Sequence, residues 1–350
     1  MLHIVVGGFY GDEGKGKICA YLSMADDFDY VVRAGGGPQA GHTIFPGKSV
    51  RQVPCGVVNR RSRLLVSRGT LINPKILLKE MEEYDVGRRL QIDYRCTVIE
   101  QRHIEAEKEL VERIGSVGAG TGYARADRVL RRAKLAQDVH ELRPFLADVQ
   151  KTVLGAIRGG KSVLVEGVHG YGLSLFNKRY PHVTSQDTTA SQFAADVGIG
   201  PLDVGEVTVV FKAYTSRVGP GPMGKEWKEE RLKKMGLSER GTVSGRPRRL
   251  GPFDKRLAAE AVQANSATQT AMTCVDRLFA GNEGVTEYEK LTDEAKLFLE
   301  NIEQYVDRMR MKEIFSGIEL ISTGPEIENT IDRRAEMIQG TTDYQNDFPI

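Results

Sequence analysis

A glycine-rich loop that directly follows a short apolar strand is the feature that most restricts how this chain can fold. The run LHIVVGG (2–8) is apolar and β-branched, and the overlapping stretch GGFYGDEGKG (7–16) contains five glycines. A strand followed by such a turn can surround an oxyanion with backbone N–H groups, which predicts a phosphate-binding loop. Two positions depart from the P-loop pattern: Phe9 replaces the first glycine, and Gly16 follows Lys15 where serine or threonine would hold Mg²⁺.

An aspartate, Asp12, lies in the middle of this loop. A carboxylate among amides directed at phosphate is repelled unless a cation or a proton transfer compensates, so we interpret Asp12 as a metal ligand and a base. The alternative is a helix N-cap aspartate in a turn, which is the commoner fate of an aspartate before a helix. The density of glycines around Asp12 argues against the N-cap.

Further strand-like runs alternate with helix-like segments along the chain. Buried strands are expected within 29–37, 63–72, 161–170, 206–214 and 317–325. Helices are expected at 74–84, 140–158 and 293–309, where apolar residues recur at three-to-four spacing. This alternation predicts an α/β fold with a mostly parallel central sheet flanked by helices and with ligands at the carboxyl ends of the strands. We expect one domain over residues 1–350, with a P-loop-like nucleotide-binding core and inserted loops.

Composition restricts the partners and the location of the protein. The net charge of +2 with 27% charged residues calls for neither nucleic acid nor a membrane as a partner. No apolar run approaches the ~20 residues of a membrane span, and no signal-peptide layout is present. A cytoplasmic location is therefore expected, in the host cytoplasm if the chain is viral. The cysteines lack the spacing of a zinc site or a disulfide framework; they are Cys19, Cys55, Cys96 and Cys274.

Three further segments have a possible chemistry, although each signal alone is weak. His42 follows a glycine-rich turn in RAGGGPQAGHT (33–43), which suits acid–base or phosphate contact, although a lone histidine is more often structural. The segment VGAGTGYARADRVLRRA (117–133) joins a glycine-rich turn to a basic helix that could bind a second phosphate. The third segment, TVSGRPRR (242–249), belongs to a stretch, 215–252, that we expect to form mobile loops around a short helix. Its guanidiniums suit a dicarboxylate, and the alternative is a solvated basic loop.

The order of these segments resembles the adenylosuccinate synthetase family across essentially the whole chain. The matching segments are GDEGKGK, AGHT, DRVLRR, VEGVHG with YPHVTSQDTTA, FKAYTSRVGPGP, GTVSGRPRRLG and ISTGPE, in the compact form of the archaeal enzymes. The resemblance implies a carbon–nitrogen ligase that uses GTP hydrolysis and Mg²⁺ to join L-aspartate to C6 of a 6-oxopurine nucleotide. It also implies a homodimer, because Arg131 matches the arginine that reaches the nucleotide phosphate of the neighbouring subunit.

The resemblance assigns roles to individual residues. Asp12 would remove the N1 proton of the purine so that O6 attacks the γ-phosphate of GTP, and would bind Mg²⁺ together with the Gly41 carbonyl. His42 would donate a hydrogen bond or a proton to the transferring group, and Lys15 would stabilise its developing charge. Asp276 matches the carboxylate that reads guanine, which favours GTP over ATP. The catalytic residues implied are Asp12, His42 and Lys15.

Three binding sets follow from the same resemblance. The GTP set is Gly11, Glu13, Gly14, Lys15, Gly16, Lys17, Gly41, His42, Thr43, Arg248, Asp276, Ser322 and Gly324. The set for the substrate nucleotide is Asp12, Gln39, Ser116, Val117, Arg131, His169, Thr184 and Arg246. The set for aspartate is Ser244, Arg246 and Arg248.

Departures from the family pattern are concentrated at the substrate nucleotide. Family members that use IMP carry NAGHT, TTG and EG-x-QG where this chain has QAGHT, SVG and EGVHG, while Tyr10 and Pro252 each replace a tryptophan. The asparagine, threonine and glutamine contact the phosphate and the 6-oxo edge of IMP. A related phage branch, the 2-amino-2′-deoxyadenylosuccinate synthetases, acts on dGMP for diaminopurine DNA and also has serine at the first threonine. That branch generally replaces the catalytic aspartate with serine and uses ATP, whereas this chain keeps Asp12 and Asp276.

These departures favour dGMP as the substrate nucleotide, because Val117 cannot donate to a phosphate and suits a sugar without a 2′-hydroxyl. The alternative is ligation of IMP in AMP biosynthesis, with neutral exchanges at these positions. A GTP-binding regulator is a further alternative, but it would have no need of the SGRPRR loop or of an Asp/His pair. A nucleotide kinase would also use Lys15 and several arginines, and would transfer phosphate to a stable acceptor without aspartate.

Overall fold

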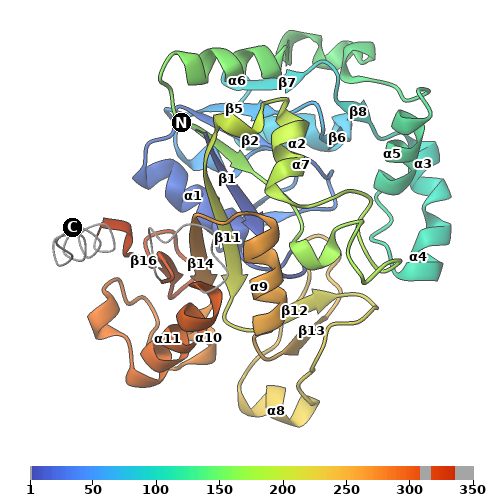
Figure 1. Ribbon diagram of the computed structural model, residues 1–350. Coiled ribbons are helices and arrows are strands. Elements are labelled where there is room, and N and C mark those ends of the chain that lie inside the picture. Colours follow the sequence, from blue (N-terminus) through green and yellow to red (C-terminus); the bar gives the residue numbers. More distant parts are fainter. Residues whose placement is uncertain (1, 308–316, 336–350) are drawn as a thin grey trace, which may run out of the picture.

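A wide sheet runs through the centre of the computed structural model, which describes residues 2–307 and 317–335 (Figure 1). Within these ranges ten strands form the sheet, and neighbours are parallel except for the edge pair β15 and β16. The predicted α/β fold with a mostly parallel sheet is confirmed. In sheet order the strands are β16 (Thr330–Asp332), β15 (Leu320–Ser322), β14 (Gln269–Thr273), β11 (Val204–Lys212), β1 (Leu2–Gly7), β10 (Val163–Glu166), β2 (Tyr30–Arg33), β5 (Arg63–Val66), β7 (Leu90–Asp93) and β9 (Leu146–Ala147).

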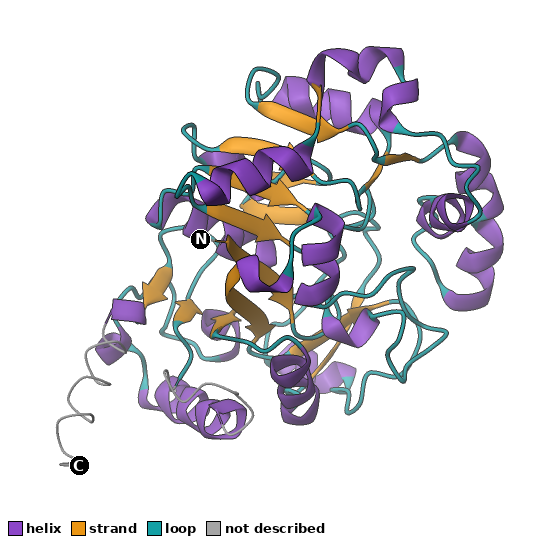
Figure 2. Ribbon diagram, turned by 45° about the horizontal axis from the view of Figure 1, so that its top comes forward, coloured by secondary structure: helices purple, strands orange, loops and turns teal. Residues whose placement is uncertain are grey.

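Helices cover both faces of this sheet (Figure 2). Helices α1 (Lys15–Ala25) and α2 (Pro74–Glu83) share a core with Val5 of β1, whereas Ile4 and Val6 belong to the core on the opposite face. That alternation is the two-residue period of a strand buried on both sides. The second core contains α6 (Val149–Arg158), α7 (Ala190–Val197), α9 (Lys255–Ala264) and α11 (Asp293–Asp307). The other α-helices are α3 (Gln101–Ala106), α4 (Lys108–Ile114), α5 (Thr121–Val129), α8 (Glu229–Lys234) and α10 (Val275–Leu278).

The expected single helix over 140–158 is wrong. Residues His140–Phe145 form a 3₁₀-helix, β9 follows, and α6 begins only after Asp148. Pro144 supplies no backbone N–H, and the Asp148 carboxylate caps α6 by accepting a bond from the backbone N–H of Lys151 at 3.0 Å. The basic helix expected within 117–133 is also shorter, because α5 ends at Val129 and Arg131 has a φ of 60°.

The stretch 215–252 is more ordered than the expected loops. Strands β12 (Thr215–Val218) and β13 (Arg248–Gly251) pair antiparallel, and the chain between them carries the short helix α8. Figure 1 shows this hairpin beside the lower end of the central strands. The remaining strands form two small pairs: β3 (His42–Phe45) with β4 (Lys48–Val50), and β6 (Leu71–Ile72) with β8 (Thr97–Val98). Within the described ranges, the helices lack the length and apolar character of a membrane span.

Candidate active site

A cavity of about 660 Å³ opens where the central strands end. Its walls come from the loops after β1, β2, β10 and β11, from the segment between α4 and α5, and from the hairpin β12–β13. This is the carboxyl edge of a parallel sheet, where ligands of α/β proteins bind. Predicted site residues that line the cavity are Gly11, Asp12, Gly14, Lys15, Gly16, Gln39, Gly41, His42, Thr43, Ser116, Val117, His169, Thr184, Ser244, Arg246 and Arg248. The predicted residues outside its lining are Glu13, Lys17, Arg131, Asp276, Ser322 and Gly324.

The Glu13 side chain holds the glycine-rich loop together through hydrogen bonds. Its Oε1 accepts bonds from the backbone N–H groups of Phe9 at 2.9 Å and Gly11 at 2.8 Å, and its Oε2 accepts from the Lys15 ammonium at 2.8 Å. Lys15 is only 1% exposed, so its charge is neutralised within the loop. The carboxylate of Glu13 therefore holds the loop and its lysine rather than facing the cavity.

The glycine after Lys15 is required by close packing. A Cβ at Gly16 would lie 2.5 Å from the Thr43 carbonyl oxygen and 2.9 Å from the His42 Cβ. Strand β3 thus lies directly on the first turn of α1, and no side chain fits between them. The serine or threonine that holds Mg²⁺ in a P-loop is excluded at this position, so a metal here needs another ligand.

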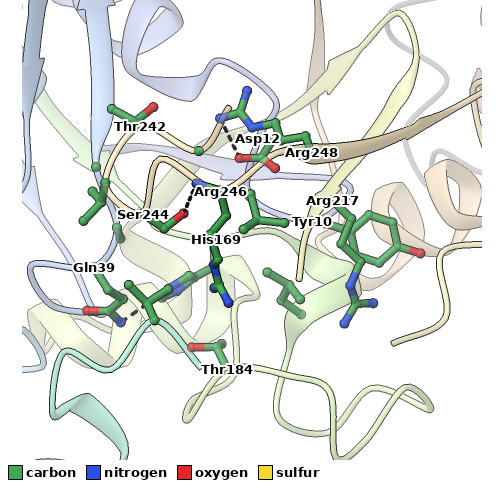
Figure 3. Close-up of a pocket in the computed structure, with 18 of the residues that line it drawn as sticks. Tyr10, Asp12, Gln39, His169, Thr184, Arg217, Thr242, Ser244, Arg246 and Arg248 are labelled. Atoms are coloured by element: carbon green, nitrogen blue, oxygen red, sulfur yellow. Dashed lines mark hydrogen bonds and ion pairs between the residues drawn. The ribbon is translucent and has the colours of Figure 1, made fainter. Parts of the chain in front are cut away.

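Asp12 is paired through one carboxylate oxygen only. Its Oδ1 lies 2.8 Å from Nη2 of Arg248, while Oδ2 is buried and has no hydrogen-bond partner in the described part of the chain (Figure 3). Burial raises the pKa of Asp12 to about 6, against the opposing charges of Arg248 and Lys212. A carboxylate with a pKa near neutrality is suited to remove a proton, and its remaining oxygen is free for a cation.

His42 is oriented by a buried carboxylate that the sequence analysis missed. Its Nδ1 lies 2.5 Å from Oε1 of Glu166, which also accepts from Arg33 Nη1. Burial raises the pKa of Glu166, but the charges of Arg33 and His42 outweigh it and bring the pKa to about 2. Burial and the Arg33 charge lower the pKa of His42 to about 4. Nδ1 also lies 2.6 Å from Arg33 Nη1, so this nitrogen is held between the guanidinium and the carboxylate, and Nε2 is left for a ligand.

Gln39 and His169 face each other across the cavity wall (Figure 3). The Gln39 amide nitrogen lies 3.5 Å from Nε2 of His169, and burial lowers the pKa of His169 to about 3. If the Gln39 amide donates across this distance, Nε2 accepts and Nδ1 of the neutral ring carries the proton. Gln39 Oε1 and His169 Nδ1 are both buried without a partner among the described residues. In that arrangement the pair offers one free acceptor and one free donor.

Ser116 and Val117 differ in what they offer a ligand. The Ser116 hydroxyl donates to Oε1 of Glu107 at 2.6 Å, so its proton is already used. Val117 is 41% exposed and lines the cavity as an apolar surface. Glu107, which the sequence analysis did not single out, is buried beneath this segment and also accepts from the backbone N–H of Gly122 at 3.1 Å.

Lys17 points away from the phosphate loop. Its ammonium donates to Ser322 Oγ at 2.6 Å, to the Gly324 carbonyl at 2.7 Å and to the Asn329 carbonyl at 2.8 Å. Burial lowers its pKa to about 8, although the charge of Asp276 opposes this. Lys17 therefore connects α1 to the segment 322–329, which contains the predicted GTP-binding residues Ser322 and Gly324. Arg131 is exposed, and its Nη1 donates to the Val129 carbonyl at 2.8 Å.

Comparisons with known proteins identify the family. The family model for adenylosuccinate synthetase matches residues 4–141 and 132–283. The adenylosuccinate synthetase of Archaeoglobus fulgidus is 48% identical over 341 residues, which cover 96% of this chain and 99% of that protein. This chain belongs to the adenylosuccinate synthetase family. It is accordingly a GTP-dependent carbon–nitrogen ligase, and the resemblance seen in its motifs is confirmed.

Solved structures of the same fold come from two different sources. The fully ligated adenylosuccinate synthetase of Plasmodium falciparum matches with a TM-score of 0.86 and 23% identity over 95% of this chain and 99% of that one. The succinoaminodeoxyadenylate synthetase of cyanophage S-2L, bound to dGMP and dATP, matches with a TM-score of 0.80 and 23% identity over 98% of each chain. At these identities the two matches show the shared fold of the adenylosuccinate synthetase family.

Proposed function

We propose that this ligase joins L-aspartate to C6 of dGMP, with GTP as phosphate donor, and produces 2-amino-2′-deoxy-N6-succinyladenylate for diaminopurine DNA. The observation that carries the choice of nucleotide is the pairing of Gln39 with His169 beside Asp12. These side chains line one cavity, and each has a polar atom without a partner in the described ranges.

The three free atoms match the edge of guanine. Guanine offers an acceptor at O6 and donors at N1 and at the 2-amino group. His169 Nδ1–H would donate to O6, Asp12 would take the N1 proton, and Gln39 Oε1 would accept from the 2-amino group. Hypoxanthine has no 2-amino group and would leave Gln39 Oε1 buried without a bond. An unsatisfied buried acceptor costs about 1–3 kcal/mol, which corresponds to roughly 5- to 150-fold in affinity.

The sugar side of the cavity supports a deoxynucleotide. Val117 presents apolar surface, and the Ser116 hydroxyl is engaged by Glu107, so neither donates readily to a ligand. A ribose 2′-hydroxyl against an apolar wall would lose its hydrogen bonds, whereas a deoxyribose has nothing to lose there. The cyanophage structure of the same fold is bound to dGMP, which is an example of this fold with the proposed nucleotide.

The reaction then divides into two displacements. Asp12 removes the N1 proton, O6 attacks the γ-phosphorus of GTP, and GDP departs. The amine of aspartate next attacks C6, and the 6-phosphoryl group departs as inorganic phosphate. Lys15 and His42 stabilise the charge on the transferring group, and Ser244, Arg246 and Arg248 bind the aspartate carboxylates.

The lining of the cavity fits Mg²⁺. Asp12 Oδ2 is a buried oxygen with no partner among the described residues, and Gly41 lines the same cavity with its backbone. Hard oxygen donors of this kind are those that Mg²⁺ prefers. Asp12 and Gly41 would hold the ion, which when bound offsets the negative charge of the phosphates. The exposed Arg131 would complete the site of a second subunit in a homodimer.

IMP is the second candidate, and a specific observation favours it. The 48% identity to the Archaeoglobus fulgidus enzyme covers nearly the whole of both chains, and that enzyme is named adenylosuccinate synthetase. On this reading the exchanges at Gln39, Val117 and His169 are neutral. The product would then be adenylosuccinate rather than its 2-amino-2′-deoxy counterpart.

A competition assay decides between the two nucleotides. Equal concentrations of dGMP and IMP are incubated in one tube with GTP, Mg²⁺, aspartate and the protein, and the two succinylated products are separated. We expect the product of dGMP to dominate, and a mixture dominated by the product of IMP overturns the proposal. Adding GMP and dIMP separates the contribution of the 2-amino group from that of the sugar.

Variants locate the cause of the preference. Gln39→Asn, Val117→Thr and His169→Gln together should shift the product ratio towards IMP. Gln91 offers a matched control, because its amide oxygen is also buried without a partner in the described ranges but lies on β7, outside the cavity lining. Gln91→Asn should leave the ratio unchanged. A triple variant with the wild-type ratio assigns the preference to other residues.

A further inference from the structure

Glu239 is a buried carboxylate in the chain between β12 and β13. Its side chain is 6% exposed and lines the cavity. Oε2 accepts from the Lys212 ammonium at 2.5 Å and from Arg248 Nη1 at 2.9 Å, and Oε1 accepts from the Tyr214 hydroxyl. Its backbone carbonyl also accepts from the Arg248 N–H at 3.0 Å. Glu239 thus joins the inserted segment to the end of β11 and to the first residue of β13.

The ionised form of Glu239 is stabilised by the residues that contact its carboxylate. Burial raises its pKa, but the charge and hydrogen bond of Lys212, the bond from Tyr214 and the charge of Arg248 bring the pKa to about 2. Glu239 and Asp12 together face the two cations Lys212 and Arg248, so an incoming carboxylate meets a guanidinium that is already held between two anions.

Each part of the Arg248 guanidinium has a different environment. Nη1 is bound to Glu239, Nη2 lies 2.8 Å from Asp12 Oδ1, and Nε is buried with no partner in the described part of the chain. A guanidinium is a rigid plane, so fixing Nη1 on one side determines the direction of the edge formed by Nε and Nη2. That edge is the one that binds a carboxylate through two parallel bonds.

We infer that Glu239 is a positioning residue for the aspartate substrate. It holds Arg248 so that the Nε–Nη2 edge is presented to an incoming carboxylate, and it keeps Arg248 from turning wholly to Asp12. Without the negative charge, Lys212 and Arg248 would be two neighbouring buried cations, and the guanidinium would lose the contact that fixes its plane. The inference rests on the proposed contact between Arg248 and aspartate.

Steady-state kinetics of the full chain test this role. Glu239→Gln keeps the size of the side chain but removes its charge, and loss of a hydrogen bond between charged groups corresponds to about tenfold or more. We expect the KM for aspartate to rise at least about tenfold, with the KM values for GTP and the nucleotide within about twofold of wild type. Glu239→Asp keeps the charge and should recover part of the loss. Equal changes in all three KM values, or none, contradict the inference.

Two further variants keep the test sharp if Glu239→Gln folds poorly. Tyr214→Phe removes only the hydroxyl that donates to Glu239, and should raise the KM for aspartate by about fivefold, the worth of one ordinary hydrogen bond. Glu226→Gln is the matched control, because Glu226 pairs with the adjacent Arg249 at 3.0 Å on the exposed side of the same hairpin. The control should leave the KM for aspartate unchanged. A Tyr214→Phe variant with wild-type kinetics, or a control with the same defect, overturns the role of Glu239.

Arg248→Leu separates this inference from the proposed function. If Arg248→Leu leaves the KM for aspartate unchanged, the contact with aspartate is wrong and the inference fails with it. If Arg248→Leu raises the KM while Glu239→Gln does not, only the role of Glu239 is wrong. When both are right, adding Glu239→Gln to Arg248→Leu has no further effect on the KM for aspartate, because the residue that Glu239 positions is already absent.

Discussion

Replacing Glu166 by glutamine should destabilise the fold and slow catalysis together. Glu166 is completely buried and accepts from Arg33 Nη1, from His42 Nδ1 at 2.5 Å and from the Cys55 N–H at 2.6 Å. Glu166→Gln leaves the Arg33 guanidinium, itself 1% exposed, without its anion. Breaking a buried ion pair on one side costs about 3–5 kcal/mol, a large part of the ~5–15 kcal/mol that stabilises a typical domain.

The effect on turnover has a separate origin. Glu166→Gln removes the carboxylate that orients the His42 ring through Nδ1 and that would stabilise a positive charge on it, so Nε2 becomes a poorer donor to the transferring group. The contribution of a positioned acid or base is about 10²-fold or more, so kcat should fall by at least that factor. The KM values should change less, because the role proposed for His42 is at the transferring group.

Glu80 provides the matched control for this experiment. It is also a buried glutamate, but among residues 2–307 and 317–335 it accepts only backbone N–H bonds, from Arg51 at 2.6 Å, Gln52 at 2.9 Å and Val53 at 3.0 Å. Glu80→Gln leaves no buried cation behind and should cost about 1–3 kcal/mol with kcat unchanged. Urea denaturation followed by circular dichroism gives the stabilities, and product formation gives kcat. Equal losses of stability in both variants, or a wild-type kcat in Glu166→Gln, would refute the reasoning.

Three further predictions concern the phosphate donor and the chemical step. Asp12→Ala should abolish ligation while GTP binding, measured by calorimetry, stays nearly unchanged, because the roles proposed for the carboxylate are proton removal and metal binding; turnover within tenfold of wild type contradicts the assignment. Asp276→Asn should lower the ratio of kcat/KM for GTP to that for ATP, because an amide can both donate and accept; an unchanged ratio assigns the discrimination elsewhere. Lys17→Met should raise the KM for GTP and leave that for aspartate unaltered, because the segment 322–329 loses the ammonium that joins its carbonyls; the opposite pattern would place Lys17 at the aspartate site.

Local sequence signals predicted the sheet and most of the cavity. Apolar β-branched runs followed by glycine were sufficient to predict β1, β2 and β10, because a strand that is buried on both faces is made of a nearly continuous apolar run. The loops after such strands meet at one edge, so Asp12 and His42 could be grouped before any distance was known, whereas His169 was assigned only through the resemblance to the family. The prediction of one helix over 140–158 was wrong because it considered the apolar spacing and not Pro144. Pro144 has no backbone N–H to donate, and the first part of the segment is a 3₁₀-helix instead of an α-helix.

The missed residues are those whose role depends on a distant partner. Glu166 ends β10 at the carboxyl edge, which was a usable signal, but its charge acquires a meaning only when Arg33 and His42 are beside it. Glu239 gave no signal, since a glutamate in a charged loop is ordinarily solvated. The sequence signal at Lys17 was misleading. Its place in the glycine-rich motif predicts a contact with phosphate, whereas its ammonium donates to carbonyls of the segment 322–329.

The contact at Gly16 also restricts how this chain can change. Any side chain at that position would have to displace β3, and β3 carries His42, so the hydroxyl of an ordinary P-loop cannot be introduced without moving the residue that we propose as catalytic. Saturation mutagenesis at position 16 should therefore return glycine alone among active clones. This glycine-rich loop therefore cannot be converted into an ordinary P-loop by a single substitution. Laboratory evolution towards P-loop chemistry would first have to repack strand β3, which carries His42.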